Sequence, residues 1–96
     1  MKTNYQMLKE LDGFKPKTSG ILTGEEVQHI ASTLHLADMD ELALRNLRDL
    51  AVMFYSLKVD SLERDGKEAE AYDVMDIISG ITGVIDSALF RIGAEV

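Results

Sequence analysis

The chain has 96 residues and a formal net charge of −7; 46% of its residues are hydrophobic, and none is cysteine. This length suits one domain, and the hydrophobic content is too high for a disordered protein. The absence of cysteine excludes disulfides and thiolate metal sites, and no stretch approaches the roughly 20 apolar residues of a membrane span. We therefore expect a single helical domain over 1–96 that is cytoplasmic and has no membrane contact.

The N-terminal segment, residues 1–20, is basic, with four lysines against two carboxylates. Its first part, NYQMLKEL, places three apolar side chains at helical spacing and predicts a short helix capped by Asn4. The following GFKPKTSG holds the only proline of the chain together with two glycines, a composition typical of a loop. The helical core is then expected over 21–96.

The stretch TGEEVQHIASTLHL begins with a capping box. Thr23 is expected to accept a hydrogen bond from the backbone near Glu26, and the Glu26 side chain to reach back. The apolar residues that follow recur at i, i+3, i+4 and i+7, which is one face of a helix. They are Val27, Ile30, Ala31 and Leu34.

A long antiparallel helical hairpin is predicted next. Asp38 and Glu41 repeat the capping pattern, so the first helix should run from about 38 to 64, with apolar side chains over more than half of its circumference. Gly66 suits the left-handed residue that ends this helix, and the second helix should run over about 67–92. We therefore predict an all-α small bundle, built from this hairpin and one or two shorter N-terminal helices and completed by dimerisation.

The stretch DIISGITGVI, residues 76–85, places two glycines within a run of isoleucines. The apolar residues in and around it follow a period of 3.6, which favours a helix over a strand. GITG matches neither a dinucleotide-binding loop nor a P-loop, so nucleotide binding is not expected. Gly80 and Gly83 then lie with Ser87 opposite the isoleucines, where another helix can approach closely. This face serves self-association or a partner, or it packs against the first helices of the same chain; alternatively, the glycines form a tolerated kink.

Patterns for metal binding and catalysis are missing from the sequence. If Gly66 were the invariant glycine of an EF-hand, the twelfth position would be Tyr72, where a glutamate is required. His29 and His35 are six residues apart, which does not suit a shared metal on one helix turn. The serines show no nucleophile-elbow pattern. We expect a non-enzymatic protein with no cofactor, no metal and no catalytic residues.

Two surfaces are predicted to make contacts. Apolar, aromatic and small residues outside the expected intramolecular core form a partner or dimer interface. They are Val52, Tyr55, Val59, Tyr72, Gly80, Gly83, Ser87 and Phe90. The second surface is acidic and consists of Glu63, Asp65, Glu68, Glu70, Asp73 and Asp76.

The charge distribution leads to the predicted function. Residues 60–96 hold nine carboxylates against three cations, so direct nucleic-acid binding is not expected. We expect a small acidic protein-binding module that regulates or inhibits a protein partner and forms a homodimer. Small acidic helical proteins of phages and mobile elements, including inhibitors of host defence nuclease complexes, are similar in size and charge only. Two alternatives stay open: a self-assembling structural or accessory subunit, and an inhibitor that mimics nucleic acid with the acidic surface over 60–76.

Overall fold

The computed structural model describes residues 3–18 and 21–94, so Lys2, Ser19 and Gly20 of the basic segment lie outside the described residues. The predicted all-α class is confirmed, and the described ranges contain no strand. Five helical elements follow one another: α1 (Asn4–Glu10), α2 (Gly24–Thr33), the 3-10 helix η1 (Leu36–Asp38), α3 (Glu41–Arg64) and α4 (Glu68–Arg91).

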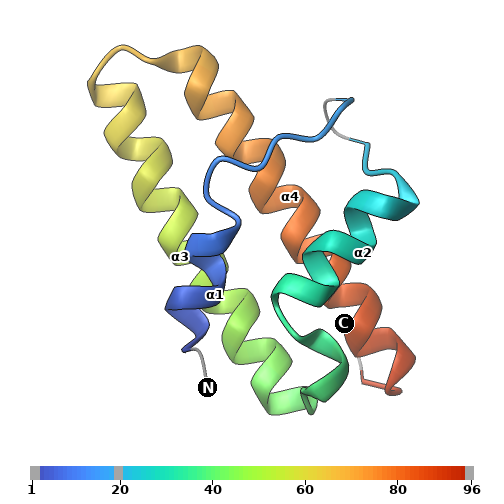
Figure 1. Ribbon diagram of the computed structural model, residues 1–96. Coiled ribbons are helices and arrows are strands. Elements are labelled where there is room, and N and C mark those ends of the chain that lie inside the picture. Colours follow the sequence, from blue (N-terminus) through green and yellow to red (C-terminus); the bar gives the residue numbers. More distant parts are fainter. Residues whose placement is uncertain (1–2, 19–20, 95–96) are drawn as a thin grey trace.

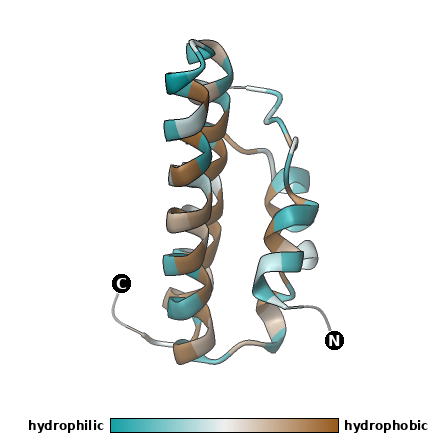
Figure 2. Cartoon of the chain, turned by 90° about the vertical axis from the view of Figure 1, so that its left-hand side faces the viewer, coloured by the Kyte–Doolittle hydropathy of each residue, from teal (hydrophilic) through white to brown (hydrophobic). Residues whose placement is uncertain are grey.

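The helices form two layers. α3 and α4 pack side by side as the predicted hairpin, and α1 and α2 lie across one side of it (Figure 2). The turn that joins α3 to α4 extends beyond α1 and α2 (Figure 1). One end of the hairpin is therefore left without a second layer of helices. Within the described residues, no helix combines the length and apolarity required to cross a membrane.

Side-chain caps set the starts of the two short helices. At α2 the predicted capping box is confirmed: the Thr23 hydroxyl accepts from the Glu26 N–H at 3.2 Å, and the Glu26 carboxylate accepts from the Thr23 N–H at 2.9 Å. At α1 the predicted cap, Asn4, is wrong by one residue. Thr3 caps this helix because its hydroxyl and the Gln6 side chain form a second reciprocal pair.

The hairpin helices begin and end close to the predicted bounds. α3 begins at Glu41 rather than near 38, because the Asp40 carboxylate accepts from the Ala43 N–H at 2.9 Å and caps the helix there. Asp38 instead ends η1. At the turn, Gly66 has φ +74°, in the left-handed region predicted for the residue that ends α3.

The core lies between the two layers and along the α3–α4 seam. α4 buries the predicted isoleucine face, and Ile81, Ile85 and Leu89 are fully buried. On α3, Tyr55 is also fully buried, and its hydroxyl donates to the Leu8 carbonyl of α1 at 2.7 Å. Val59 of α3 is only 6% exposed. The prediction that Tyr55 and Val59 belong to an exposed interface is wrong, because both side chains are buried in the intramolecular core.

Candidate protein-binding surfaces

A cleft of about 260 Å³ runs along α4 and brings together Gly80, Gly83 and Ser87 of the predicted interface. Asp76 of the predicted acidic surface also lines this cleft. The facing wall comes from α2 and the segment before it, and consists of Pro16, Ile21, Leu22 and Val27. We call this feature the α4 cleft.

The two glycines of the α4 cleft have different surroundings. A Cβ atom placed on Gly80 would lie 3.1 Å from Cδ1 of Leu22, whereas one placed on Gly83 would meet nothing within 4 Å. The position of close approach at Gly80 is therefore filled by the same chain, through a loop residue rather than a helix. The open part of the cleft begins at Gly83.

Glu26 holds the facing wall of the α4 cleft in place through hydrogen bonds. This side chain is buried, and its carboxylate accepts hydrogen bonds from the backbone N–H groups of Thr23 and Lys17, each at 2.9 Å. These two bonds, first that from Thr23 and then that from Lys17, hold the pKa of Glu26 below its usual range. The capping box thus also fixes the loop that faces α4.

The wall residues Ile21 and Leu22 were missed by sequence reasoning, although a local signal for one of them exists. Leu22 directly precedes the cap residue Thr23, and Val27 is the fourth residue of α2. An apolar pair at these two positions is the hydrophobic staple that accompanies many capping boxes. Both side chains line the same cleft, as that motif predicts.

The other predicted interface residues do not join the α4 cleft. Phe90 is 75% exposed and Tyr72 is 66% exposed, and neither lines it. The two rings are 18 residues apart on α4, which is about 27 Å at 1.5 Å per residue. Val52 is 40% exposed and lies on α3. The predicted interface is therefore not one patch, and its two ends lie at opposite ends of the hairpin.

The predicted acidic surface is also divided. Glu63, Asp65, Glu68 and Glu70 are exposed at the end of the hairpin, and we call them the acidic tip. Asp73 is half-buried and pairs with Lys15, with 3.5 Å between the carboxylate and Nζ. Asp76 is half-buried in the lining of the α4 cleft. Of the six residues of the predicted acidic surface, only the four of the tip are exposed.

A depression of about 190 Å³ lies at the acidic tip. It is lined by Glu63, Glu68, Ala71, Tyr72 and Met75. Carboxylates beside an aromatic ring and a thioether suit the side chain of a lysine or arginine. The aliphatic stem of such a residue packs on apolar atoms while its cation meets the carboxylates and the ring face.

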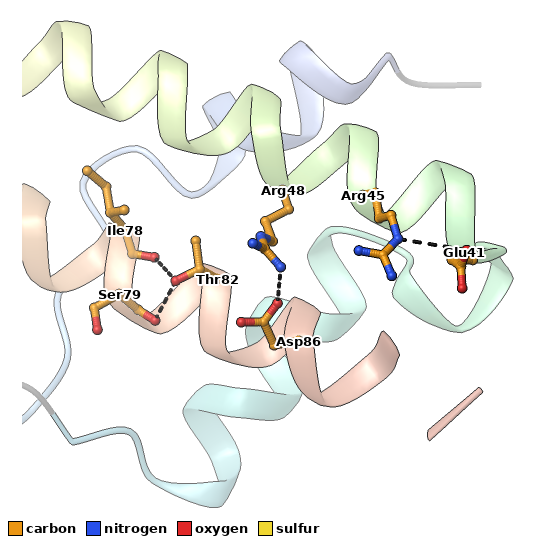
Figure 3. A network of polar contacts seen from close by, with 7 residues as sticks. All are labelled: Glu41, Arg45, Arg48, Ile78, Ser79, Thr82 and Asp86. Carbon is orange, nitrogen blue, oxygen red and sulfur yellow. Dashed lines mark hydrogen bonds and ion pairs between the residues drawn. The ribbon is translucent and has the colours of Figure 1, made fainter. Parts of the chain in front are cut away.

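In the C-terminal part of α4, Asp86 and Thr82 have polar partners within the chain. Arg48 of α3 donates to Asp86 at 2.7 Å across the hairpin (Figure 3). The Thr82 hydroxyl lies 2.9 Å from the Ile78 carbonyl and 3.1 Å from the Ser79 carbonyl, both on its own helix (Figure 3). This part of α4 therefore presents little uncompensated charge.

Neither a group of metal-binding side chains nor similarity to a known protein assigns a role to these surfaces. In the part of the chain that the structure describes, no three His, Asp or Glu side chains are grouped to hold a metal ion. Comparison of the chain with protein-family models, curated proteins and solved structures finds no match. The inference of function therefore rests on the geometry of the acidic tip and of the α4 cleft.

Proposed function

We propose that the chain is a small non-enzymatic protein-binding module that regulates or inhibits a partner by covering a basic surface on it. One observation carries the proposal: Glu63 and Glu68 of the acidic tip line a depression of about 190 Å³ together with an exposed aromatic ring, Tyr72. Aromatic residues such as tyrosine are common anchors of protein interfaces, and the rim around them is polar. A lysine or arginine of the partner enters the depression and contacts Glu63, Glu68 and the Tyr72 ring.

The charge around the tip favours a basic partner over a longer range. Residues 60–76 contain seven carboxylates and two cations, Arg64 and Lys67. Such an excess attracts a cationic surface before contact and raises the rate of association. Because salt screens exposed charges beyond about 10 Å at 0.1 M, the affinity should fall as salt rises.

The first experiment compares two variants with the same change in net charge. The tip variant carries Glu63→Gln, Glu68→Gln and Glu70→Gln, and the control carries Glu25→Gln, Asp38→Asn and Asp49→Asn at exposed positions elsewhere. The full-length tagged chain captures its partner from producing cells, and the partner is identified by mass spectrometry. We expect the tip variant to lose the partner and the control to retain it. Equal capture by both variants would place the binding surface elsewhere.

The seven carboxylates of 60–76 also favour a second candidate function, the mimicry of nucleic acid. Mimicry places the chain in a site that normally holds a phosphate backbone, so duplex DNA or RNA should displace it from the purified partner. Tyr72→Ala separates the two candidates. An anchored protein interface should lose at least about tenfold in affinity, whereas a mimic that depends on charge alone should keep its affinity.

A further inference from the structure

The C-terminal part of α4, residues 77–91, carries an exposed ring and an open space on the same side of the helix. Phe90 is 75% exposed, the highest value among the large hydrophobic side chains of the described residues. Gly83 lies seven residues earlier, about two helical turns, so both positions point to the same side of α4. Gly83 is exposed, and a Cβ there would meet nothing within 4 Å.

We propose that α4 pairs antiparallel with α4 of a second copy, across a two-fold axis near Asp86 and Ser87. In this arrangement the Phe90 ring of each copy enters the α4 cleft of the other copy beside Gly83. The contact is reciprocal: the two-fold axis that places Phe90 of one copy beside Gly83 of the other also places Phe90 of the other copy beside Gly83 of the first. Both rings and both clefts are then used, and the assembly closes as a dimer instead of growing into a filament.

The α4 cleft has the composition to receive an aromatic ring. Its facing wall includes Ile21, which is 65% exposed, and Val27, which is 37% exposed. Around Gly83 the floor is made mostly of small residues, with Asp76 two helical turns away at the other end of the cleft, so the backbones of two helices can come close. Burying the ring against these apolar groups removes exposed hydrophobic surface from both copies.

The charges of α4 favour this antiparallel overlap over a parallel one. Residues 68–76 carry four carboxylates and no cation, whereas residues 77–91 carry only Asp86 and Arg91. Near the proposed axis, Asp86 is neutralised by Arg48 of its own copy at 2.7 Å. The acidic N-terminal ends of the two α4 helices then lie roughly 28 Å from the axis on opposite sides, about 55 Å apart at 1.5 Å per residue. This separation far exceeds the Debye length of about 10 Å, so the two acidic tips hardly repel each other.

Sedimentation of the full-length chain over a range of concentrations tests the pairing. The wild type should form a dimer, and Phe90→Ser should raise the dissociation constant at least about tenfold. Tyr72→Ser is the matched control, since it removes the other highly exposed ring of α4 outside the overlap and should leave the dissociation constant of the dimer unchanged. Circular dichroism should show unchanged helicity in both variants. A wild type that stays monomeric at high micromolar concentration overturns the proposal, as does a dimer that tolerates Phe90→Ser.

Because the chain has no cysteine, single introduced cysteines report the orientation of the pair. Ser87→Cys lies beside the proposed axis and should form an intermolecular disulfide under mild oxidation, since Cα atoms within about 7 Å can be bridged. Ser61→Cys, exposed on α3 near the tip, is the control and should remain unlinked. A dimer in which Ser87→Cys fails to cross-link, or in which Ser61→Cys links as readily, overturns the antiparallel arrangement. These outcomes are independent of partner capture by the acidic tip.

Discussion

The N-terminal part of α4, residues 68–76, and its longer C-terminal part, residues 77–91, belong to one continuous helix but differ in charge and in the side chains that they bury. The N-terminal part carries four carboxylates and buries only small side chains, Ala71 and Val74. The C-terminal part has no net charge and buries four isoleucine and leucine side chains. The second layer of helices lies over the end of the hairpin away from the tip (Figures 1 and 2). Stability is therefore concentrated in the C-terminal part of α4, which leaves the N-terminal part available for recognition.

The largest expected effect on stability comes from a core substitution in the C-terminal part of α4. Ile81 is fully buried, so Ile81→Ala should lower the free energy of unfolding by about 2–5 kcal/mol, from lost transfer energy and the cavity left behind. Tyr72→Ala in the N-terminal part of α4 should change the free energy of unfolding by no more than about 0.5 kcal/mol, because the ring is 66% exposed. Urea unfolding followed by circular dichroism, at one protein concentration, measures both. Similar losses of unfolding free energy in the two variants would mean that both parts of α4 contribute equally to stability.

The second prediction concerns the hydrogen bond that joins α1, in the second layer of helices, to the hairpin. The Tyr55 hydroxyl joins α3 to the Leu8 carbonyl of α1 at 2.7 Å. That carbonyl also accepts from the Leu11 N–H at 3.1 Å, so Tyr55→Phe leaves it a partner and should cost only about 1 kcal/mol. The exposed Tyr72→Phe is the control and should be neutral in urea unfolding.

The same hydroxyl gives the protein a sensitivity to alkali. Burial raises the pKa of Tyr55 to about 12, whereas the pKa of tyrosine in an unfolded chain is about 10. The folded state therefore favours the protonated phenol. This contribution is complete below about pH 10 and is lost as the pH rises towards 12. The wild type should lose stability over this range more steeply than Tyr55→Phe, and parallel curves would contradict the assignment.

Local patterns were sufficient to predict the helices, since each one depends on neighbours in sequence. The apolar period of α4, the capping box of Thr23 and Glu26, and the left-handed Gly66 all involve residues within one or two turns. The all-α hairpin followed from these. The 3-10 helix η1 was not predicted, because the capping pattern in the sequence starts the long helix at Asp38, whereas Asp40 caps α3 and Asp38 ends η1.

The surfaces were harder to predict because they depend on which element covers a flanking position. The sequence pattern places Tyr55 and Val59 beside the main apolar face of α3, and a helical wheel does not show that further elements cover them, as the structure does. Gly80 presents the same difficulty, since it is met by Leu22 from a loop more than 50 residues away. Phe90 and Tyr72 were placed at the surface correctly, because each lies directly opposite the buried face of α4.

The smallest expected effect on stability distinguishes Gly83 from Gly80, both in the C-terminal part of α4. Alanine in a helix interior is favoured over glycine by roughly 1 kcal/mol, and a methyl group at Gly83 meets nothing within 4 Å. Gly83→Ala should therefore stabilise the folded monomer by about 0.5–1 kcal/mol, measured by urea unfolding at low protein concentration. At Gly80 the same methyl lies 3.1 Å from Leu22 Cδ1, so the gain should be smaller or absent.

Gly83→Ala should also affect self-association, in the opposite direction. The added methyl occupies part of the space that Phe90 of the second copy would fill, so the variant should dimerise more weakly than the wild type although its monomer is more stable. The two effects separate by concentration, because monomer stability is independent of it whereas dimer stability rises with it. Gly80→Ala should leave dimerisation unchanged, since Leu22 of the same chain already covers that position. If both substitutions weakened the dimer equally, the contact would lie over the whole small-residue face and not at Gly83, and the pairing across Asp86 and Ser87 would have to be abandoned.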